Sequence, residues 1–146
     1  MENSVRKRRI LTVLFLAAAL VSCENVFHND SLDFMWRLDR IEFAGGTDFD
    51  GNACSARSVS GLWVSFARDL VEIQNNNDYF GTIGILTEYG DSLRLDFSMC
   101  ADETGLDAEL KEFGIGSRIS TFCKTRLDRE GMTLSGDRTT LYFTRW

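Results

Sequence analysis

Residues 92–99 read Ser92-Leu93-Arg94-Leu95-Asp96-Phe97-Ser98-Met99, and apolar and polar side chains alternate along them. A period of two residues is typical of a β-strand with one face in a core and the other in solvent. The pattern predicts that Leu93, Leu95, Phe97 and Met99 point inward. Neighbouring segments repeat this period more often than that of a helix, so we expect an all-β body.

Working outward from this stretch, we expect seven further strands. Turn-forming residues such as Asn75-Asn76-Asn77-Asp78 and Tyr89-Gly90-Asp91 separate them, and a long polar loop covers residues 44–60. The expected strands are residues 35–43, 61–66, 70–74, 79–88, 118–127, 132–135 and 139–146. One helix is expected at residues 101–113, where Leu106, Leu110 and Phe113 form an apolar stripe.

Eight strands joined by short turns favour a closed barrel over a flat sheet, because closure removes both exposed edges. The predicted fold is an eight-stranded antiparallel up-and-down barrel with one short helix; a single strand over residues 62–74 would make the count seven. Such a barrel is either filled by side chains or holds one small ligand. The inward side chains that we expect to contact a ligand are Phe66, Ile85, Leu95, Phe97 and Phe143.

The N-terminal segment is typical of a secretory signal. Arg6-Lys7-Arg8-Arg9 precede an eleven-residue apolar run at residues 10–20, too short for a membrane span of ~20 residues. Leu20-Val21-Ser22-Cys23 then resembles the lipobox of bacterial lipoproteins. The resemblance implies cleavage before Cys23 and acylation of that cysteine, which would anchor the chain at a membrane. Residues 1–22 would be the signal peptide, 23–33 a lipidated flexible tether and 34–146 the barrel domain.

The layout of the body resembles the small lipocalin-like lipoproteins of Gram-negative bacteria, members of the calycin group. Trp36 lies on the first strand, where lipocalins place a tryptophan at the barrel floor, and Arg145 lies on the last, where they place an arginine that packs over it. The segment from Leu127 to Phe143 resembles the closing hairpin of these domains. Phe34 departs from the pattern, which usually has glycine there. In related lipoproteins an Asp after the lipidated cysteine can signal inner-membrane retention; Glu24 is not that signal, so we expect the outer membrane, on its periplasmic or surface side.

Three cysteines lie in the body, namely Cys54, Cys100 and Cys123. In an eight-stranded up-and-down barrel, the loops after the first and fifth strands lie at the same end, so Cys54 and Cys100 could form a disulfide. Three reduced thiols are the alternative. Cys123 lies within a strand and is expected to be a small buried side chain.

The composition argues against several functions. The 146 residues carry a net charge of −6, but residues 23–146 hold 12 basic and 21 acidic residues, a net charge of −9, which argues against nucleic-acid binding. The single histidine, His28, falls in the tether, which argues against histidine-dependent catalysis. No cofactor-binding pattern is present. Residues 48–52 resemble part of a calcium loop, but its twelfth position would be Val59, so a turn is expected and no metal.

These observations favour a non-catalytic, lipid-anchored cell-envelope protein that binds a small hydrophobic or amphipathic ligand. The alternative is a protein-interaction module, such as an inhibitor of a basic secreted enzyme or a subunit of an envelope complex; a scaffold with a solid core is a third hypothesis. An apolar cavity of at least ~300 Å³ would favour the ligand. Trp63 and Trp146 lie opposite the apolar rows and either mark a binding surface or cover the barrel.

Overall fold

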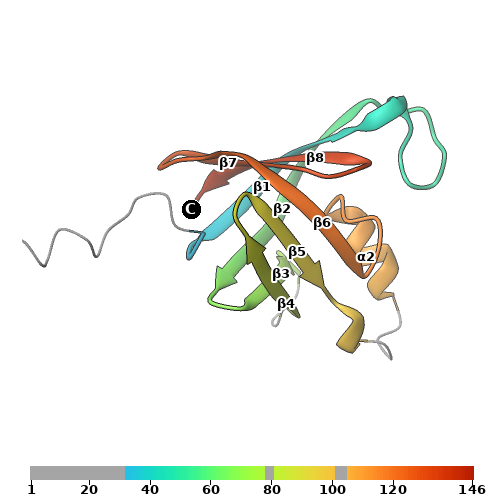
Figure 1. Ribbon diagram of the computed structural model, residues 1–146. Helices are drawn as coiled ribbons and strands as arrows, with labels where there is room; N and C mark the ends of the chain where they lie inside the picture. The colour runs from blue at the N-terminus through green and yellow to red at the C-terminus, as the bar shows by residue number, and fades with distance from the viewer. Residues whose placement is uncertain (1–31, 78–80, 101–104) are drawn as a thin grey trace, which may run out of the picture.

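The computed structural model describes residues 32–77, 81–100 and 105–146. Within these ranges eight antiparallel strands follow one another around a closed barrel, and the last pairs with the first (Figure 1). The strands are β1 (Met35–Phe43), β2 (Ala56–Ala67), β3 (Leu70–Asn75), β4 (Thr82–Tyr89), β5 (Ser92–Asp96), β6 (Ile119–Leu127), β7 (Gly131–Ser135) and β8 (Thr139–Arg145). The predicted eight-stranded up-and-down barrel is confirmed, and the count of seven is excluded because a turn at Arg68–Asp69 separates β2 from β3.

The helical segments lie in the connections. Short 3-10 turns, η2 (Ala44–Gly46) and η3 (Ser98–Cys100), follow β1 and β5, and the helix α2 (Leu106–Glu112) precedes β6. The expected apolar stripe of the helix is confirmed, since Leu106, Leu110 and Phe113 are each 1% exposed. The first residues of the predicted helix, 101–104, lie outside the described residues.

A bulge in β1 lets two pairs of apolar residues face the same interior. Trp36 and Leu38 lie at even positions and Ile41 and Phe43 at odd positions, yet all four are buried. The pairing register with both β2 and β8 shifts between Leu38 and Arg40. Against β8 the strand β1 advances two residues for one, so Asp39 is the inserted residue there, whereas against β2 the extra residues lie on β2. The extra residue reverses the alternation of side chains, as bulges do.

The barrel has two dissimilar ends. The connections after β2, β4 and β6 are tight turns, and both the start of β1 and the C-terminus lie beside them; we call this the closed end (Figure 1). The connections after β1, β3, β5 and β7 lie at the other end, which we call the mouth, and α2 lies there. The interior between the ends is lined by one cluster of buried apolar side chains that also includes those of α2.

The structure corrects the predicted orientation of Ile85, which is 39% exposed on the outer face of β4. The sequence analysis placed Ile85 on the inner face. Gly84 and Leu86 point inward instead, because Phe97 of the neighbouring segment fills the space over Gly84. A Cβ atom on Gly84 would lie 2.7 Å from Cδ1 of Phe97.

Three other expectations for the strands are wrong. Met99 is 82% exposed, because β5 ends at Asp96 and η3 follows. Cys123 is exposed, because it shares the outer face of β6 with Ile119 and Thr121. The loop expected at residues 44–60 is shorter, because β2 already begins at Ala56. Arg57 and Ser58 are polar, yet they belong to this strand and pair with β1.

The inward and outward assignments can be tested by a matched pair of substitutions. Phe97→Ala should lower the free energy of unfolding by about 3–5 kcal/mol, because it leaves a cavity over Gly84. Ile85→Ala should lower it by less than about 1 kcal/mol, because Ile85 lies on the outer face, where its truncation leaves no closed cavity. Urea unfolding followed by circular dichroism measures both. Equal losses for the two variants would contradict the assignment.

Candidate binding site at the barrel mouth

Helix α2 lies at the mouth, where hydrogen bonds tie it to β2 and β4, two strands that are separated by β3. Arg57 of β2 donates from Nη2 to the carbonyl oxygens of Lys111 and Glu112, both at 2.9 Å. The Thr82 hydroxyl at the start of β4 donates to Oε2 of Glu109 at 3.0 Å. These bonds attach the middle of the helix to β4 and its C-terminal end to β2, which fixes its position at the mouth.

Arg57 places its positive charge at the C-terminal end of α2, where a cation is favourable. The last carbonyl groups of a helix have no partner within the helix, and a cation is stabilising there. The guanidinium also lies 5.6 Å from the ring centroid of Phe43, and its Nε has no hydrogen-bond partner in the described part of the chain. Arg57 was not singled out by the sequence, because its partners are backbone atoms more than fifty positions away.

The segment after α2 completes the cover. Gly114 has φ +75°, and a Cβ atom there would lie 2.5 Å from Cδ2 of Leu141. The Thr139 hydroxyl, buried at the start of β8, donates to the carbonyl oxygen of Gly114 at 2.6 Å. Only glycine fits this approach, which brings the chain directly onto interior side chains of the barrel.

Ion pairs hold the outer side of the cover. Lys111 Nζ lies 2.7 Å from Oδ1 of Asp50, and Arg118 Nε lies 2.8 Å from Oδ1 of Asp107. The hydrogen bond from Arg118 lowers the pKa of Asp107. Because both pairs are partly solvated, each contributes little to stability on its own, and they serve mainly to fix the position of the helix.

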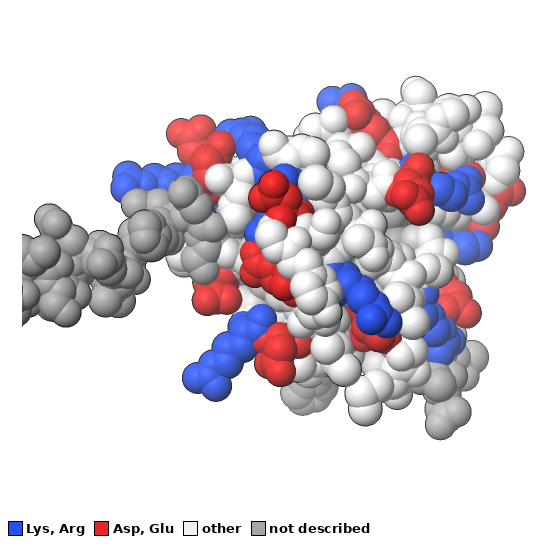
Figure 2. Space-filling view, viewed as in Figure 1, with Lys and Arg blue, Asp and Glu red and all other residues white. Residues whose placement is uncertain are grey.

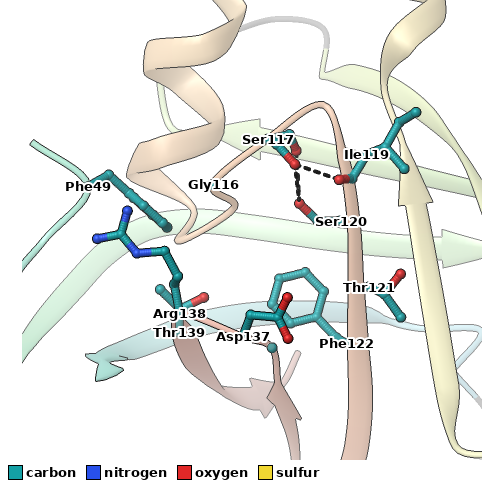
Figure 3. Close-up of a pocket in the computed structure, with 11 residues that line it drawn as sticks. Phe49, Gly116, Ser117, Ile119, Ser120, Thr121, Phe122, Asp137, Arg138 and Thr139 are labelled. Carbon is teal, nitrogen blue, oxygen red and sulfur yellow. Dashed lines mark hydrogen bonds between the residues drawn. The ribbon is translucent and has the colours of Figure 1, made fainter. Parts of the chain in front are cut away.

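A pocket of about 390 Å³ opens beside the cover, on the rim of the mouth (Figure 3). We call it the rim pocket. Its residues come from the β1–β2 loop, the segment after α2, the start of β6 and the β7–β8 turn. They are Phe49, Gly116, Ser117, Ile119, Ser120, Thr121, Phe122, Gly136, Asp137, Arg138 and Thr139.

Phe49 and Ile119 give the rim pocket its exposed apolar surface, and Phe122, which is 3% exposed, separates it from the core. Glycines make room for both aromatic rings. A Cβ atom on Gly116 would lie 2.7 Å from Cε1 of Phe49, and one on Gly136 would lie 2.9 Å from Cδ1 of Phe122. Arg138 lies over Phe49, with its guanidinium carbon 5.0 Å from the ring centroid. The arginine is fixed in turn by a 3.0 Å hydrogen bond to the carbonyl oxygen of Asp48.

The polar side of the rim pocket carries hydroxyl groups and one carboxylate. Ser117 Oγ lies 3.3 Å from Ser120 Oγ, and Ser120 Oγ donates to the Ser117 carbonyl at 2.9 Å (Figure 3). Asp137 also lines the pocket. The serines therefore bond to each other and to backbone carbonyls. A pocket with apolar rings on one side and hydroxyls and charges on the other matches a small amphipathic molecule.

The loop that supplies Phe49 is the stretch that resembles part of a calcium loop, and it forms a turn. Asp48 Oδ1 accepts hydrogen bonds from the backbone N–H groups of Asp50 and Asn52, at 3.0 and 2.8 Å. Hydrogen bonds from Asn52, through its backbone and its side-chain amide, lower the pKa of Asp48. No cluster of metal-ligating side chains occurs within residues 32–77, 81–100 and 105–146.

The residues predicted to hold a ligand do not line the rim pocket. Phe66, Leu95, Phe97 and Phe143 point inward as expected, and each is 0–5% exposed beneath the cover. Ile85 lies on the outer wall. The sequence did not indicate the rim residues, since they come from four separate segments and only the closure of the barrel brings them together.

The floor of the barrel follows the sequence expectation in part. Trp36 is 1% exposed, and its indole N–H donates to the carbonyl oxygen of Leu32 at 3.1 Å. Arg145 pairs with Trp36 in the strand register, but its guanidinium carbon lies 3.4 Å from the ring centroid of Phe34. The aromatic ring at position 34, where the family pattern has glycine, thus contacts the cation.

The predicted disulfide is not formed, because Cys54 and Cys100 are both free thiols. They lie at the mouth, as the strand count implies, but on different walls. Cys54 Sγ contacts the carbonyl oxygen of Ala56 at the start of β2, whereas Cys100 Sγ donates to the carbonyl oxygen of Ile83 in β4. Strand β3 separates the two positions.

The architecture defines a small calycin-type barrel, and comparison with known proteins gives the family. The lipocalin-like domain family matches residues 18–146, so the chain belongs to that family. A lipocalin-like protein from Bacteroides uniformis is similar in structure, with 15% identity, a TM-score of 0.59, and coverage of 79% of this chain and 98% of that one. An uncharacterized protein from Bacteroides eggerthii shows 19% identity and a TM-score of 0.58, with coverage of 80% and 100%. No curated protein matches the chain.

The role of Arg57 in holding the cover predicts a local effect. Arg57→Ala should lower the free energy of unfolding by roughly 1.5–3 kcal/mol, because two charge-assisted hydrogen bonds are lost. It should also speed amide hydrogen exchange in residues 106–115, as measured by mass spectrometry. Arg94→Ala is the control, since Arg94 forms only an exposed ion pair with Asp96. Unchanged exchange in the Arg57 variant would show that the helix is held by other contacts.

Proposed function

We propose that this protein is a non-catalytic, lipid-anchored protein of the cell envelope that binds a small amphipathic ligand in the rim pocket. The observation that carries the proposal is the composition and size of that pocket. Its volume of about 390 Å³ lies within the range of small-molecule sites, and aromatic rings face a few hydrogen-bonding groups across it. The lipocalin-like family of the chain supports a binding role in general.

The rim supports this role better than the barrel interior. Phe66, Leu95, Phe97 and Phe143 are buried in the packed core, where a ligand could contact them only if neighbouring side chains moved. That they contact a ligand stays a prediction. Phe49 and Arg138 belong to connections at the mouth and are only partly covered, so the rim pocket needs no such motion.

The bonding of the two serines that line the rim pocket supports the non-catalytic part of the proposal. Ser117 and Ser120, the hydroxyls nearest each other in the rim pocket, donate to the carbonyl oxygens of Ile119 and Ser117. A catalytic serine is normally bonded to a base that removes its proton. Asp137 and Arg138 would then orient a ligand through charge and hydrogen bonds.

The anchor is proposed from Cys23 and the segment before it, which lie outside the described residues. The family match begins at residue 18 and so includes the lipobox-like stretch, which supports the proposal. No helix within the described ranges is long and apolar enough to cross a membrane. Residue 32 enters the barrel at the closed end, so an anchor at Cys23 would leave the mouth facing away from the lipid surface. We propose the outer membrane as the location.

A protein partner is the second candidate function. Leu70, Ile83 and Ile85 lie on the outer faces of β3 and β4 and are 39–53% exposed, with Leu70 opposite Ile85 in the register. Exposed aliphatic clusters of this kind can mark interaction surfaces. Native mass spectrometry of the purified protein separates the two functions, because a bound small molecule and a bound protein add very different masses.

The ligand site can be tested with anilinonaphthalene sulfonate, an amphipathic anion whose fluorescence rises in apolar sites. Phe49→Ala should raise its Kd about tenfold, since an aromatic wall is removed. Phe34→Ala is the matched control, because Phe34 is also partly buried under an arginine but lies at the closed end. Equal effects of both substitutions, or none, would overturn the rim pocket as the site.

The anchor can be tested by metabolic labelling of the native host with an alkyne analogue of palmitate. The wild-type chain should take up the label and sediment with the outer membrane, whereas Cys23→Ala should lose the label and retain the uncleaved N-terminal segment. Cys123→Ala is the control for an exposed cysteine. A wild-type chain without label would contradict the anchor and leave the rim-pocket test unaffected.

A further inference from the structure

A second concave site lies on the outer wall of the barrel, away from the mouth cover. A pocket of about 280 Å³ is lined by Met35, Trp63, Gln74, Asn75, Asn76 and Trp146. These residues come from β1, β2, the end of β3 and the residue after β8. We call it the tryptophan pocket. It shares no residue with the rim pocket.

The two tryptophans form an angled pair. Their ring centroids lie 4.6 Å apart and their planes meet at 76°. Trp146 is 73% exposed, although the backbone N–H of this residue continues the ladder by donating to the carbonyl oxygen of Met35 at 3.1 Å. Leaving so large an apolar ring in water costs free energy that burial would recover. The ring thus presents an apolar face to whatever enters the pocket.

A hydrogen bond to Asn76 holds the indole of Trp63 in place. Its indole N–H donates to Oδ1 of Asn76 at 3.0 Å, and the backbone N–H of Asn76 donates to the carbonyl oxygen of Gly61 at 2.9 Å. Gly61 has φ +75°, and a Cβ atom there would lie 2.5 Å from Nδ2 of Asn76. The glycine therefore lets the amide pack against the strand, and the amide fixes the indole.

The polar side chains of the lining are the amides of Gln74, Asn75 and Asn76, and no side chain of the lining is ionisable. Asn75 Oδ1 already accepts a hydrogen bond from the backbone N–H of Asn77 at 2.8 Å, and Asn76 Oδ1 accepts one from the indole of Trp63. An amide can form more than one hydrogen bond, so it can bond a ligand hydroxyl while it keeps such a partner. Arg37, which lies opposite Trp63 in the strand register, is ion-paired with Asp39 at 2.7 Å. The chemistry of the pocket therefore suits a neutral ligand that has hydroxyl groups around its edge and an apolar face.

We propose that the tryptophan pocket binds a neutral saccharide. A pyranose ring has an apolar face of C–H bonds that can lie on the exposed indole of Trp146, and hydroxyls at its edge that the amides can bond. The 76° angle prevents a flat chain from lying across both indoles, so one sugar ring lies on Trp146 while the second indole bounds it. An extended peptide fits less well, because the closed barrel has no free strand edge to pair with it.

The test uses nuclear magnetic resonance of the indole N–H groups, with maltotriose, cellotriose and chitotriose as probes. The sequence has three tryptophans, and Trp36, bonded to Leu32 on the barrel floor, is an internal control. At least one probe should shift the Trp63 and Trp146 signals in a saturable way and leave that of Trp36 unchanged. No saturable shift with any of the three at millimolar concentration would overturn the proposal.

Variants make the outcome specific. Trp146→Ala should raise the Kd of the bound saccharide about tenfold, with the Trp36 signal unchanged as evidence of folding. Tyr89→Ala, which removes an equally exposed aromatic ring from the β4–β5 turn, should leave the Kd unchanged. Phe49→Ala should also leave it unchanged, which separates this site from the rim pocket. A response to phosphatidylcholine vesicles in place of the saccharides would overturn the proposal in favour of membrane contact.

Discussion

The pairing of β1 with both β2 and β8 is the constraint on which the rest of the structure depends. It turns a row of strands into a closed barrel, so that no strand edge is left exposed. Closure requires a single inner face along the whole of β1, and the inserted residue Asp39 provides it by bringing Trp36 and Ile41 to the same side. Once the interior is defined, the connections after β2, β4 and β6 are tight turns at one end, and the two longest connections, after β1 and β5, lie at the other.

The long connections determine where a ligand can bind. The segment between β5 and β6 is long enough to cross the mouth, and Gly114 lets it approach Leu141 closely. The interior is thereby covered at the mouth. The rim pocket lies outside this cover, between it and the β7–β8 turn. Some residues of this small barrel therefore serve both parts: Phe122 and Thr139 are buried, and they also line the rim pocket.

The sequence predicted the parts of the fold in which one strand carries its own signal. The alternation in residues 92–97 placed Leu95 and Phe97 correctly, and the strand at Met35–Phe43 has the predicted bounds. It misplaced Ile85, because whether Gly84 or Ile85 points inward depends on the volume of Phe97 across the strand pair. The rim pocket and the Arg57 contact also depend on residues far apart in sequence. Backbone atoms or the shape of a turn bring these residues together, and neither leaves a pattern in the sequence.

The distribution of charge indicates how such a protein recognises its ligands. Several ion pairs join residues two positions apart in the chain, as in Arg37 with Asp39 and Arg94 with Asp96. Acidic and basic side chains are accordingly interspersed on the face shown in Figure 2 rather than gathered in a patch of one sign. A net negative charge spread in this way produces little directional steering, because salt screens it within about 8 Å. Recognition must then depend on short-range contacts, and the aromatic rings beside hydroxyls at the rim and beside amides on the outer wall supply them.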